Sequence, residues 1–515
     1  MIRSYLCTAY VAVAALVVPL VLDSAPALAQ MDTLRGSTVS MPPGRGNPLT
    51  GFGTPGTYTW SGMFDTLTVI DETGDASPAL AASWRNIAPT KWEFTLRSGV
   101  KFHNGEPLTA ASIAADFNYL LTDEGKATVA GGTLSPMLVG ARALNELTME
   151  IETTAPNPEL PREVIKLFIV EPKAWNDLGV EDFSNNPVGT GAYRVVDWSP
   201  EKVTFVAFEG AWRPAKIKNF SVVEVPDQSA RVQALLAGSI DLAPGISIDA
   251  IEVIEAAGGK VDIFPAPYIM AWPFLTLRDI PFKDKRVRQA ANYAVDKEAI
   301  VRELLKGTGH PAGQGATRKT FGYNPAVQPY PYDPEKARQL LNEAGYGDGF
   351  KMTVELLTGF FAADALIYQQ VAQDLTRVGI KTDIVSIAFG DFLTKIRPGA
   401  GKPLGYGPEV MAFQMDFPLG VGSTAANNVA RNWSCRRANQ YYCNEEEVGI
   451  LAQAETEFDL ETRRAKLQEL MALQHENAPG LFLIEISDLV GRGGNIHGVN
   501  MVDRIINYHE ITKSE

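Results

Sequence analysis

Apolar and polar residues alternate in short blocks along the chain, and two periods recur. Residues 91–96 alternate with period two and predict a strand. Residues 110–121 place apolar side chains at helical spacing after Thr109, which is a suitable N-cap. Because strand and helix patterns continue to alternate in this way, the sequence predicts an α/β fold with a substantial sheet.

The second half of the chain repeats the pattern with clear helix ends. Asp333 is the expected cap of one helix, and residues 363–378 form another before a strand over 380–387. A third long helix is expected over 457–475, with Thr456 as its N-cap. No linker rich in Gly, Ser or Pro interrupts these elements, so we expect no independently tethered domains.

The first 29 residues have the pattern of a secretory signal peptide. Arg3 gives a charged start, an apolar run covers 10–22, and Ala-Leu-Ala at 27–29 is a typical cleavage site. We therefore expect a mature chain that starts at Gln30 and works in the periplasm. The apolar run is shorter than the ~20 residues needed to span a bilayer, so an uncleaved anchor is the less favoured alternative.

The composition is that of a large globular protein. Of 515 residues, 45% are hydrophobic and 21% are charged, which is enough to build a core in more than one domain. The formal net charge of -14 argues against nucleic acid and anionic membrane surfaces as partners.

Removal of the signal peptide would leave two cysteines, Cys435 and Cys443, in a polar stretch. In an oxidising compartment, two cysteines this close predict a local disulfide, with unlinked thiols as the alternative. A zinc site is disfavoured because no histidine lies nearby at ligand spacing.

No catalytic or metal-binding motif stands out. The sequence has no G-x-S-x-G, no H-E-x-x-H and no P-loop, and its five histidines are never paired at i, i+4 spacing. We therefore expect no catalytic residues, no cofactor and no metal. A secreted hydrolase that uses a carboxylate pair is the alternative from another functional class, although no motif singles out such a pair.

Six segments resemble the landmarks of one transport family and occur in its order. They cover residues 80–84, 94–110 (FTLRSGVKFHNGEPLTA), 186–193, 234–241, 281–296 and 340–346. Through them the chain resembles the dipeptide, oligopeptide and nickel binding proteins of ABC transporters, which are family 5 of the solute-binding proteins. The resemblance covers nearly the whole chain after the signal peptide.

Most of these landmark residues are expected to be scaffold. Gly99 and Gly105 suit turns that need positive φ, and Phe94 and Phe102 suit the core. His103 lies alone beside Asn and Gly, and we expect it to be a hydrogen-bonded structural residue rather than a metal ligand.

The resemblance implies a two-lobed periplasmic-binding-protein fold of type II, cluster C, with an extra subdomain in the first lobe. The expected boundaries are 1–29 for the signal peptide, 30–68, 187–275 and 486–515 for lobe I, 69–186 for its subdomain, and 276–485 for lobe II. The lobes would close on a ligand by a hinge motion. The closed monomer would then hand the ligand to the membrane permease subunits of an ABC importer.

The resemblance also implies where the ligand binds. In peptide-binding members an aspartate pairs with the α-ammonium of the ligand, and Asp416 is the matching position. Ala412, Phe413 and Gln414 would lie beside it, with backbone groups that pair with a peptide as an added strand.

The opposite wall of the site is expected from a Gly- and Pro-rich segment ahead of a helix over 60–67. Thr54, Gly56, Thr57 and Tyr58 are the predicted contacts there, since glycine lets a ligand approach the backbone closely.

A short peptide or another amine-bearing compound is the expected ligand. The chain departs from many peptide binders, because Phe413 stands where they have a tryptophan and Phe417 and Pro418 follow Asp416. An opine, an oligosaccharide or a nickel or haem chelate is therefore the alternative within the family.

Overall fold

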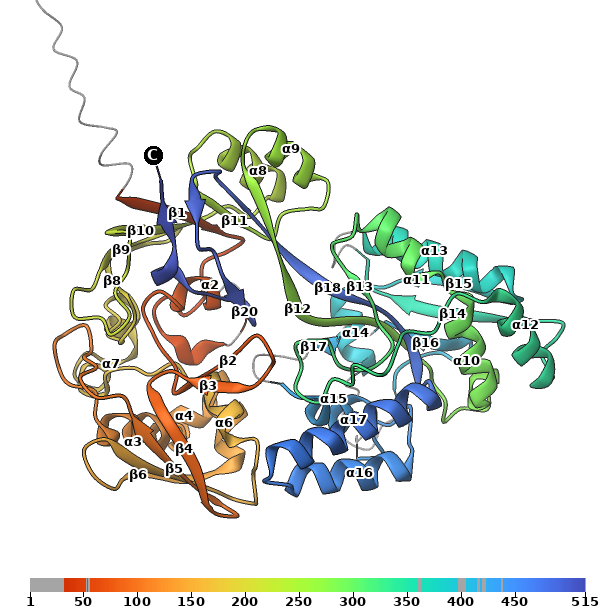
Figure 1. The fold of residues 1–515 in the computed structure, drawn as a ribbon, viewed down its shortest axis with the longest axis horizontal. Helices are drawn as coiled ribbons and strands as arrows, with labels where there is room; N and C mark the ends of the chain where they lie inside the picture. The colour runs from red at the N-terminus through yellow and green to blue at the C-terminus, as the bar shows by residue number, and fades with distance from the viewer. Residues whose placement is uncertain are drawn as a thin grey trace, which may run out of the picture.

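The computed structural model describes residues 32–51, 53, 56–358, 363–396, 404–414, 417–418, 423–436 and 439–514. Figure 1 shows two lobes side by side, with the C-terminal strands folded back onto the first lobe. Two long strands, β12 (Lys260–Pro273) and β18 (Gly480–Arg492), pair antiparallel and run from one lobe to the other. The predicted α/β fold with two lobes is confirmed. The predicted residue boundaries remain predictions, because β12 and β18 pass between the lobes without a break.

A nine-stranded sheet joins the core of the first lobe to these connecting strands. Its order is β17-β12-β18-β11-β1-β10-β9-β8, and β13 pairs with β18 off this path. Strand β1 lies parallel to both β10 and β11. The remaining strands of the sheet are β1 (Thr33–Thr38), β8 (Tyr193–Ser199), β9 (Lys202–Ala207), β10 (Asn219–Glu224), β11 (Leu242–Pro244), β13 (His310–Pro311) and β17 (Phe417–Pro418).

A separate antiparallel sheet lies beside this one in the first lobe. Its order is β4 (Ala81–Ala88), β5 (Lys91–Leu96), β7 (Thr148–Thr153) and β6 (Leu138–Ala143). Strand β5 matches the strand predicted over 91–96, and α3 (Ala110–Tyr119) matches the predicted helix. Thr109 caps α3 as expected, in a capping box with Ser112. Phe94 and Phe102 are fully buried, as predicted, in the core of this lobe.

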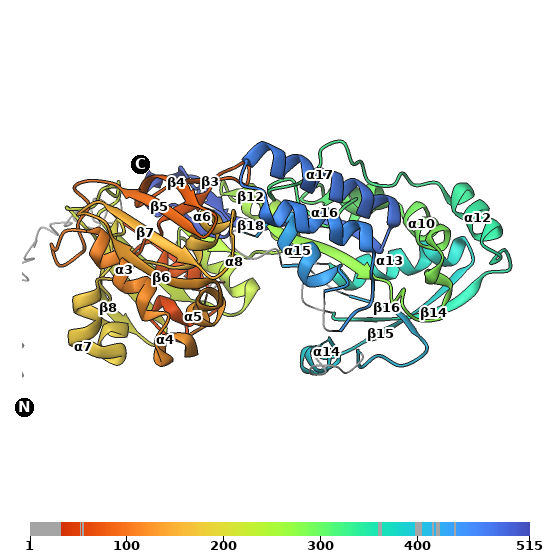
Figure 2. The ribbon, with the colours of Figure 1, turned by 90° about the horizontal axis from the view of Figure 1, so that it is seen from below.

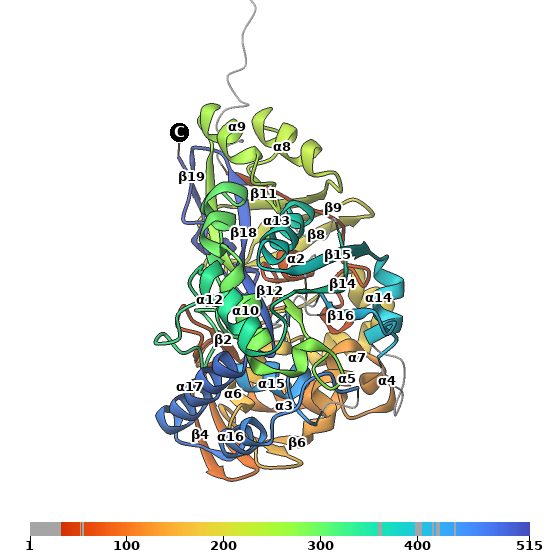
Figure 3. The same cartoon turned by 90° about the vertical axis from the view of Figure 1, so that its right-hand side faces the viewer.

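The second lobe contains a parallel sheet of order β15 (Ile380–Ser386), β14 (Phe350–Leu356) and β16 (Val410–Phe413). The predicted helices around it are confirmed as α12 (Pro334–Glu343), capped by Asp333, and α13 (Asp364–Arg377). Figure 3 shows α13 next to β14 and β15. In a parallel sheet all strands end at the same edge, so Thr358 after β14 and Gln414 after β16 lie at one end of this sheet.

Two predicted helices begin and end at other residues. The segment around Thr456 forms α16 (Glu445–Thr456) and α17 (Leu460–Asn477), so Thr456 ends one helix and Asp459 caps the next. Asp459 accepts a hydrogen bond from the Thr462 N–H and so caps α17. Thr456 is the last residue of α16 and is not in a position to cap α17. The helix predicted over 60–67 is instead α2 (Gly56–Trp60), in which the ring of Trp60 packs against Gly56.

The other elements complete the two lobes. The helices are α4 (Asp123–Ala127), α5 (Val129–Leu134), α6 (Leu160–Glu163), α7 (Pro172–Asn185), α8 (Gln228–Leu236), α9 (Ala250–Ala256), α10 (Lys285–Ala294), α11 (Lys297–Ala299), α14 (Phe389–Ile396) and α15 (Ala425–Asn432). The strands are β2 (Thr68–Ile70), β3 (Ala76–Pro78), β19 (Ile496–His497), β20 (Met501–Val502), β21 (Ile505–Ile506) and β22 (Thr512–Lys513).

Figure 2 shows one end of α17 next to the β3 end of the first lobe. Charged side chains form ion pairs between the lobes at this place. This interlobe cluster consists of Asp75, Glu159 and Arg162 from the first lobe and Phe321, Arg463 and Arg464 from the second. Nε of Arg463 lies 2.8 Å from Oε1 of Glu159, and Nη2 of Arg464 lies 2.8 Å from Oδ2 of Asp75. The ring of Phe321 stacks against the arginines, with the guanidinium carbon of Arg162 3.9 Å from its centroid.

Candidate functional site

A cavity of about 380 Å³ lies at the strands that connect the lobes. Residues of β12, β18 and the C-terminal β20–β21 turn form its floor, and residues near α8 and α13 form its walls. The lining residues are Gln228, Gly245, Ile246, Ile248, Tyr268, Met270, Leu305, Thr308, Gly309, Ile367, Ile484, Ile486, Ser487, Asp488, Leu489 and Arg504. The cavity is therefore mainly apolar, with a few polar groups and one pair of charges.

The cavity takes alternate side chains of β12. Successive side chains of a strand point to opposite faces, and in β12 Tyr268 and Met270 line the cavity. Ile269 lies between these two residues and Ala271 follows Met270. Both belong to a core cluster of the second lobe that includes Phe321.

The charges in the cavity lining are Asp488 of β18 and Arg504. Nε and Nη2 of Arg504 donate to the two carboxylate oxygens of Asp488 over 2.7 and 2.6 Å. The guanidinium carbon lies 4.4 Å from the ring centroid of Tyr268. Two parallel hydrogen bonds and a stacked ring fix the guanidinium in one orientation at the cavity floor.

Among the predicted first-lobe contacts that the structure describes, Tyr58 lies near the Asp488–Arg504 pair. Tyr58 is 8% exposed, and burial raises the pKa of its hydroxyl, with the charges of Asp488 and Arg504 acting on it. Gly56 and Thr57 are also buried in α2. Thr54 lies outside the described residues. The role of these residues as ligand contacts stays a prediction.

The predicted contacts on the second lobe are core residues in the structure. Ala412, Phe413 and Gln414 are fully buried. Ala412 pairs with β14 on one side and forms a bridge to Phe274 on the other, and Gln414 accepts a hydrogen bond from the Leu357 N–H. Their backbone and side-chain groups already have partners, and their contact with a ligand stays a prediction.

Asp416, the predicted anchor, lies outside the described residues. Before Asp416 in the sequence, Gln414 directly follows β16. After Asp416, β17 pairs with Tyr268, which lines the cavity, and with Ile269 of β12. Residues Tyr268, Asp488 and Arg504 were not predicted from the sequence, because no local motif marks them. Asp503 and Arg504 between two short apolar pairs indicate a hairpin turn, but not what it faces.

His103 has the structural role predicted for it. Its Nδ1 accepts the Gly189 N–H over 3.3 Å, so the proton is on Nε2, which donates to the Gly191 carbonyl over 3.1 Å. Burial lowers the pKa of His103 to about 4. The neutral ring therefore bonds to both ends of the Gly189–Gly191 segment. Both ring nitrogens are occupied by protein groups rather than a metal.

We expect His103→Gln to reduce the pH dependence of stability between pH 4 and 6.5. The folded pKa of about 4 is below the ordinary 6.5, so the unfolded chain binds a proton first and stability falls as the pH drops through this window. The full shift corresponds to about 3 kcal/mol. Denaturant unfolding at a series of pH values measures it. His497→Gln, which changes an exposed histidine, should keep the wild-type slope, and an equal slope in both variants would contradict the prediction.

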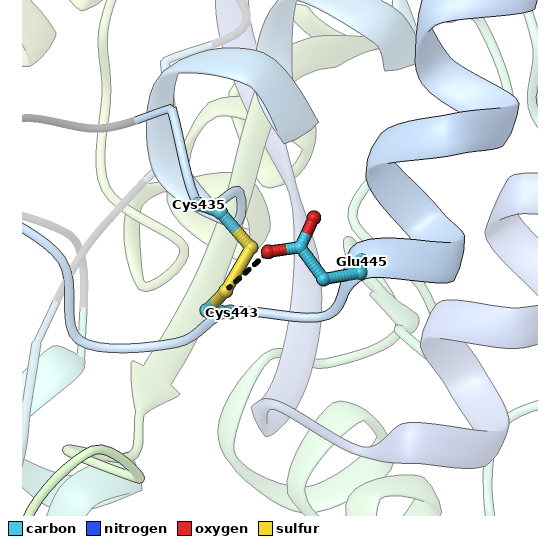
Figure 4. A group of neighbouring side chains, drawn as sticks. All are labelled: Cys435, Cys443 and Glu445. Carbon is cyan, nitrogen blue, oxygen red and sulfur yellow. Dashed lines mark hydrogen bonds between the residues drawn. A yellow bond between two sulfur atoms is a disulfide. The ribbon is translucent and has the colours of Figure 1, made fainter.

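The predicted disulfide between Cys435 and Cys443 is present (Figure 4). The carboxylate of Glu445 lies 3.9 Å from the Cys443 sulfur. Within the described residues this is the group of three whose donor atoms lie close enough for a metal ion. Since both sulfurs are bonded to each other, neither is a thiolate that could ligate one.

A comparison with protein families supplies the broader context. Residues 75–402, more than half of the chain, match the profile described as "Bacterial extracellular solute-binding proteins, family 5 Middle". The chain belongs to this family. The resemblance found in the sequence is therefore confirmed.

Two relatives illustrate the range of the family. The chain is 28% identical over 316 residues to the glutathione-binding protein GsiB of Pectobacterium atrosepticum, covering 60% of each protein. It is 28% identical over 364 residues to heme-binding protein A of Haemophilus influenzae, covering 63% of this chain and 64% of the relative. Both matches thus span less than two thirds of the length of the relative.

Solved structures confirm the fold class. HbpA2 from Haemophilus parasuis superposes with a TM-score of 0.82 at 20% identity, covering 94% of this chain and 100% of that one. DppA from Helicobacter pylori, in complex with the peptide STSA, gives 0.70 at 21% identity, covering 94% and 98%. The two-lobed type II fold is shared with these proteins. Within the described residues, no helix combines the length and apolar character needed to cross a membrane.

Proposed function

We propose that the protein captures a small ligand between its lobes in the periplasm and delivers it to the permease subunits of an ABC importer. The observation that carries this proposal is the cavity at the connecting strands. Its volume of about 380 Å³ is in the range of small-molecule sites, and both lobes supply its lining. A ligand that contacts both lobes favours the arrangement in which those contacts form, and this is the signal a transporter can recognise.

We propose a carrier rather than an enzyme, acting as a monomer after cleavage of a signal peptide over 1–29. Membership of an extracellular solute-binding family supports this, as do the binding functions in the names of its relatives. The one pair of charges in the cavity lining is a carboxylate bonded twice to a guanidinium, which leaves neither group as a general base. The predicted signal peptide lies outside the described residues.

The ligand class that fits best is a short peptide or another amine-bearing compound. The cavity combines aliphatic walls with separated polar groups such as Gln228, Tyr268 and Ser487, as suits a molecule with apolar side chains and a polar main chain. Asp416 would supply the partner of an ammonium group. The glutathione-binding relative is named for a peptide-like ligand and supports the same class.

Mass spectrometry of the natively purified protein, followed by a thermal-shift screen, tests the proposal. The screen uses apolar dipeptides, glutathione, haem and a nickel chelate. We expect a peptide-like compound to raise the melting temperature, since a ligand at 100 times its Kd stabilises the folded state by about 2.7 kcal/mol. Asp416→Ala should weaken that binding and leave the ligand-free melting temperature unchanged. Conversion of a probe to product, or no response to any class and no co-purified molecule, would contradict the proposal.

A further inference from the structure

Arg504 is presented to the cavity by an uncommon turn. Val502 pairs with Ile505, so Asp503 and Arg504 are the two central residues of the β20–β21 hairpin. Both have left-handed backbones, with φ of 49° and 64°. Such two-residue turns favour Asn-Gly, because residues with a Cβ are strained there. A strained residue at a cavity wall suggests that its side chain is held there for a function.

The guanidinium of Arg504 has donors left over. An arginine carries five N–H groups, and Asp488 takes one from Nε and one from Nη2. The two N–H groups of Nη1 and the second one of Nη2 remain, and within the described part of the chain they have no recorded acceptor. These groups form a second fork at the end of the guanidinium, and its geometry matches the two oxygens of a carboxylate.

The charges near this end of the cavity favour an anion. The Asp488–Arg504 pair is balanced, while a second guanidinium, that of Arg231, donates to the carbonyl of the lining residue Gly245 over 2.8 Å. The recorded hydrogen bonds of Arg231 go to main-chain carbonyls, and the acid that acts on it, Asp227, is exposed. Water screens the exposed carboxylate of Asp227 more than the buried guanidinium of Arg231, so Arg231 adds positive charge near the cavity.

We propose that Arg504 is a binding residue for a carboxylate of the ligand, which the free fork holds at the cavity floor while the aliphatic walls hold an apolar body. The inference rests on the proposed function and names the charge that its ligand carries. A singly charged carboxylate fits better than a phosphate, because Arg504 is the sole cation among the lining residues and a dianion needs more donors. Asp488 and Tyr268 are positioning residues, since they orient the guanidinium.

The test compares matched acids and amides by isothermal titration calorimetry of the full mature protein. One pair of probes is a mixture of apolar dipeptides with free carboxyl termini and the same mixture as C-terminal amides. The other pair is octanoate and octanamide. We expect the wild type to bind an acid about 10- to 100-fold more tightly than its amide, as for a lost charge-assisted hydrogen bond. If the acid is preferred only within the dipeptide pair, the carboxylate that Arg504 binds is a peptide C-terminus. If the acid is preferred within both pairs, Arg504 also binds the carboxylate of organic acids.

Two variants separate recognition from folding. Asp488→Asn with Arg504→Gln removes both charges together, so neither is left unpaired, and should bind acid and amide equally. Arg504→Lys keeps the charge but not the fork and should retain only part of the preference. The matched control is Arg492→Gln, because Arg492 makes a similar pair with Asp262 further along β18, outside the cavity lining. It should keep the wild-type preference.

Three results would overturn the inference. They are equal affinity of the wild type for acid and amide, an acid preference that survives in the double variant, and no binding of any of the four probes. The first two leave the proposed function standing, because a ligand still binds. If none of the four probes binds, the inference fails. The proposed function is then tested independently by the identity of the co-purified molecule and by the broader thermal-shift screen.

Discussion

Replacing Glu159 with glutamine is expected to lower the free energy of unfolding by about 3 to 5 kcal/mol, because buried arginines lose a shared counter-charge. Oε1 of Glu159 lies 2.8 Å from Nε of Arg463, and Oε2 lies 3.2 Å from Nε of Arg162. The side chains of the two arginines are only 6% and 4% exposed. Glutamine keeps the shape but leaves three guanidinium groups in the interlobe cluster with one carboxylate. Denaturant unfolding measures the loss.

The matched control for this variant is Glu152→Gln. Glu152 lies 3.3 Å from the Lys91 ammonium, and both side chains are more than a third exposed. Exposed pairs of this kind contribute at most about 1 kcal/mol, since water screens them. Equal stability of the two variants would show that the interlobe cluster is solvated and does not hold the lobes together.

Elements whose signals are local could be predicted from the sequence. Thr109 and Asp333 cap their helices because a cap needs only the next three residues. Gly99 and Gly105 have φ of 75° and 90°, as their places in turns require. The disulfide also closes a short loop within one polar stretch. In each case the deciding interaction lies within a few positions of the residue.

Features set by contacts between distant parts of the chain could not be predicted. Asp488 and Arg504 meet because the C-terminal hairpin returns to the side of β18, and Tyr268 joins them from β12. The sequence around Ala412 and Phe413 resembles a ligand-binding segment, yet the pairing of β16 with β14 buries both side chains. Burial of this kind depends on which strand lies alongside, which periodicity does not reveal.

Gly189, Thr190 and Gly191 belong to the landmark segments that were expected to be mostly scaffold. The packing of Gly191 against the turn after α2 explains why glycine is required there. A Cβ on Gly191 would lie 2.5 Å from the Met63 carbonyl carbon and 2.6 Å from the Gly62 oxygen. The Gly191 N–H also donates to the Met63 carbonyl over 3.0 Å, which fixes the two backbones at this distance. Because both contacts are with backbone atoms, no side-chain rotation can relieve them.

We therefore expect Gly191→Ala to lower the free energy of unfolding by about 3 kcal/mol, at the upper end for an overpacked site. Denaturant unfolding measures this, with Gly132→Ala as the control. Gly132 is exposed in α5, and a Cβ there meets nothing closer than 3.8 Å, so alanine should be neutral or slightly stabilising. Displacing the turn also moves α2, which carries Tyr58 beside the Asp488–Arg504 pair. Ligand affinity should fall with stability in Gly191→Ala, and a variant as stable as Gly132→Ala would contradict the close approach of the two backbones.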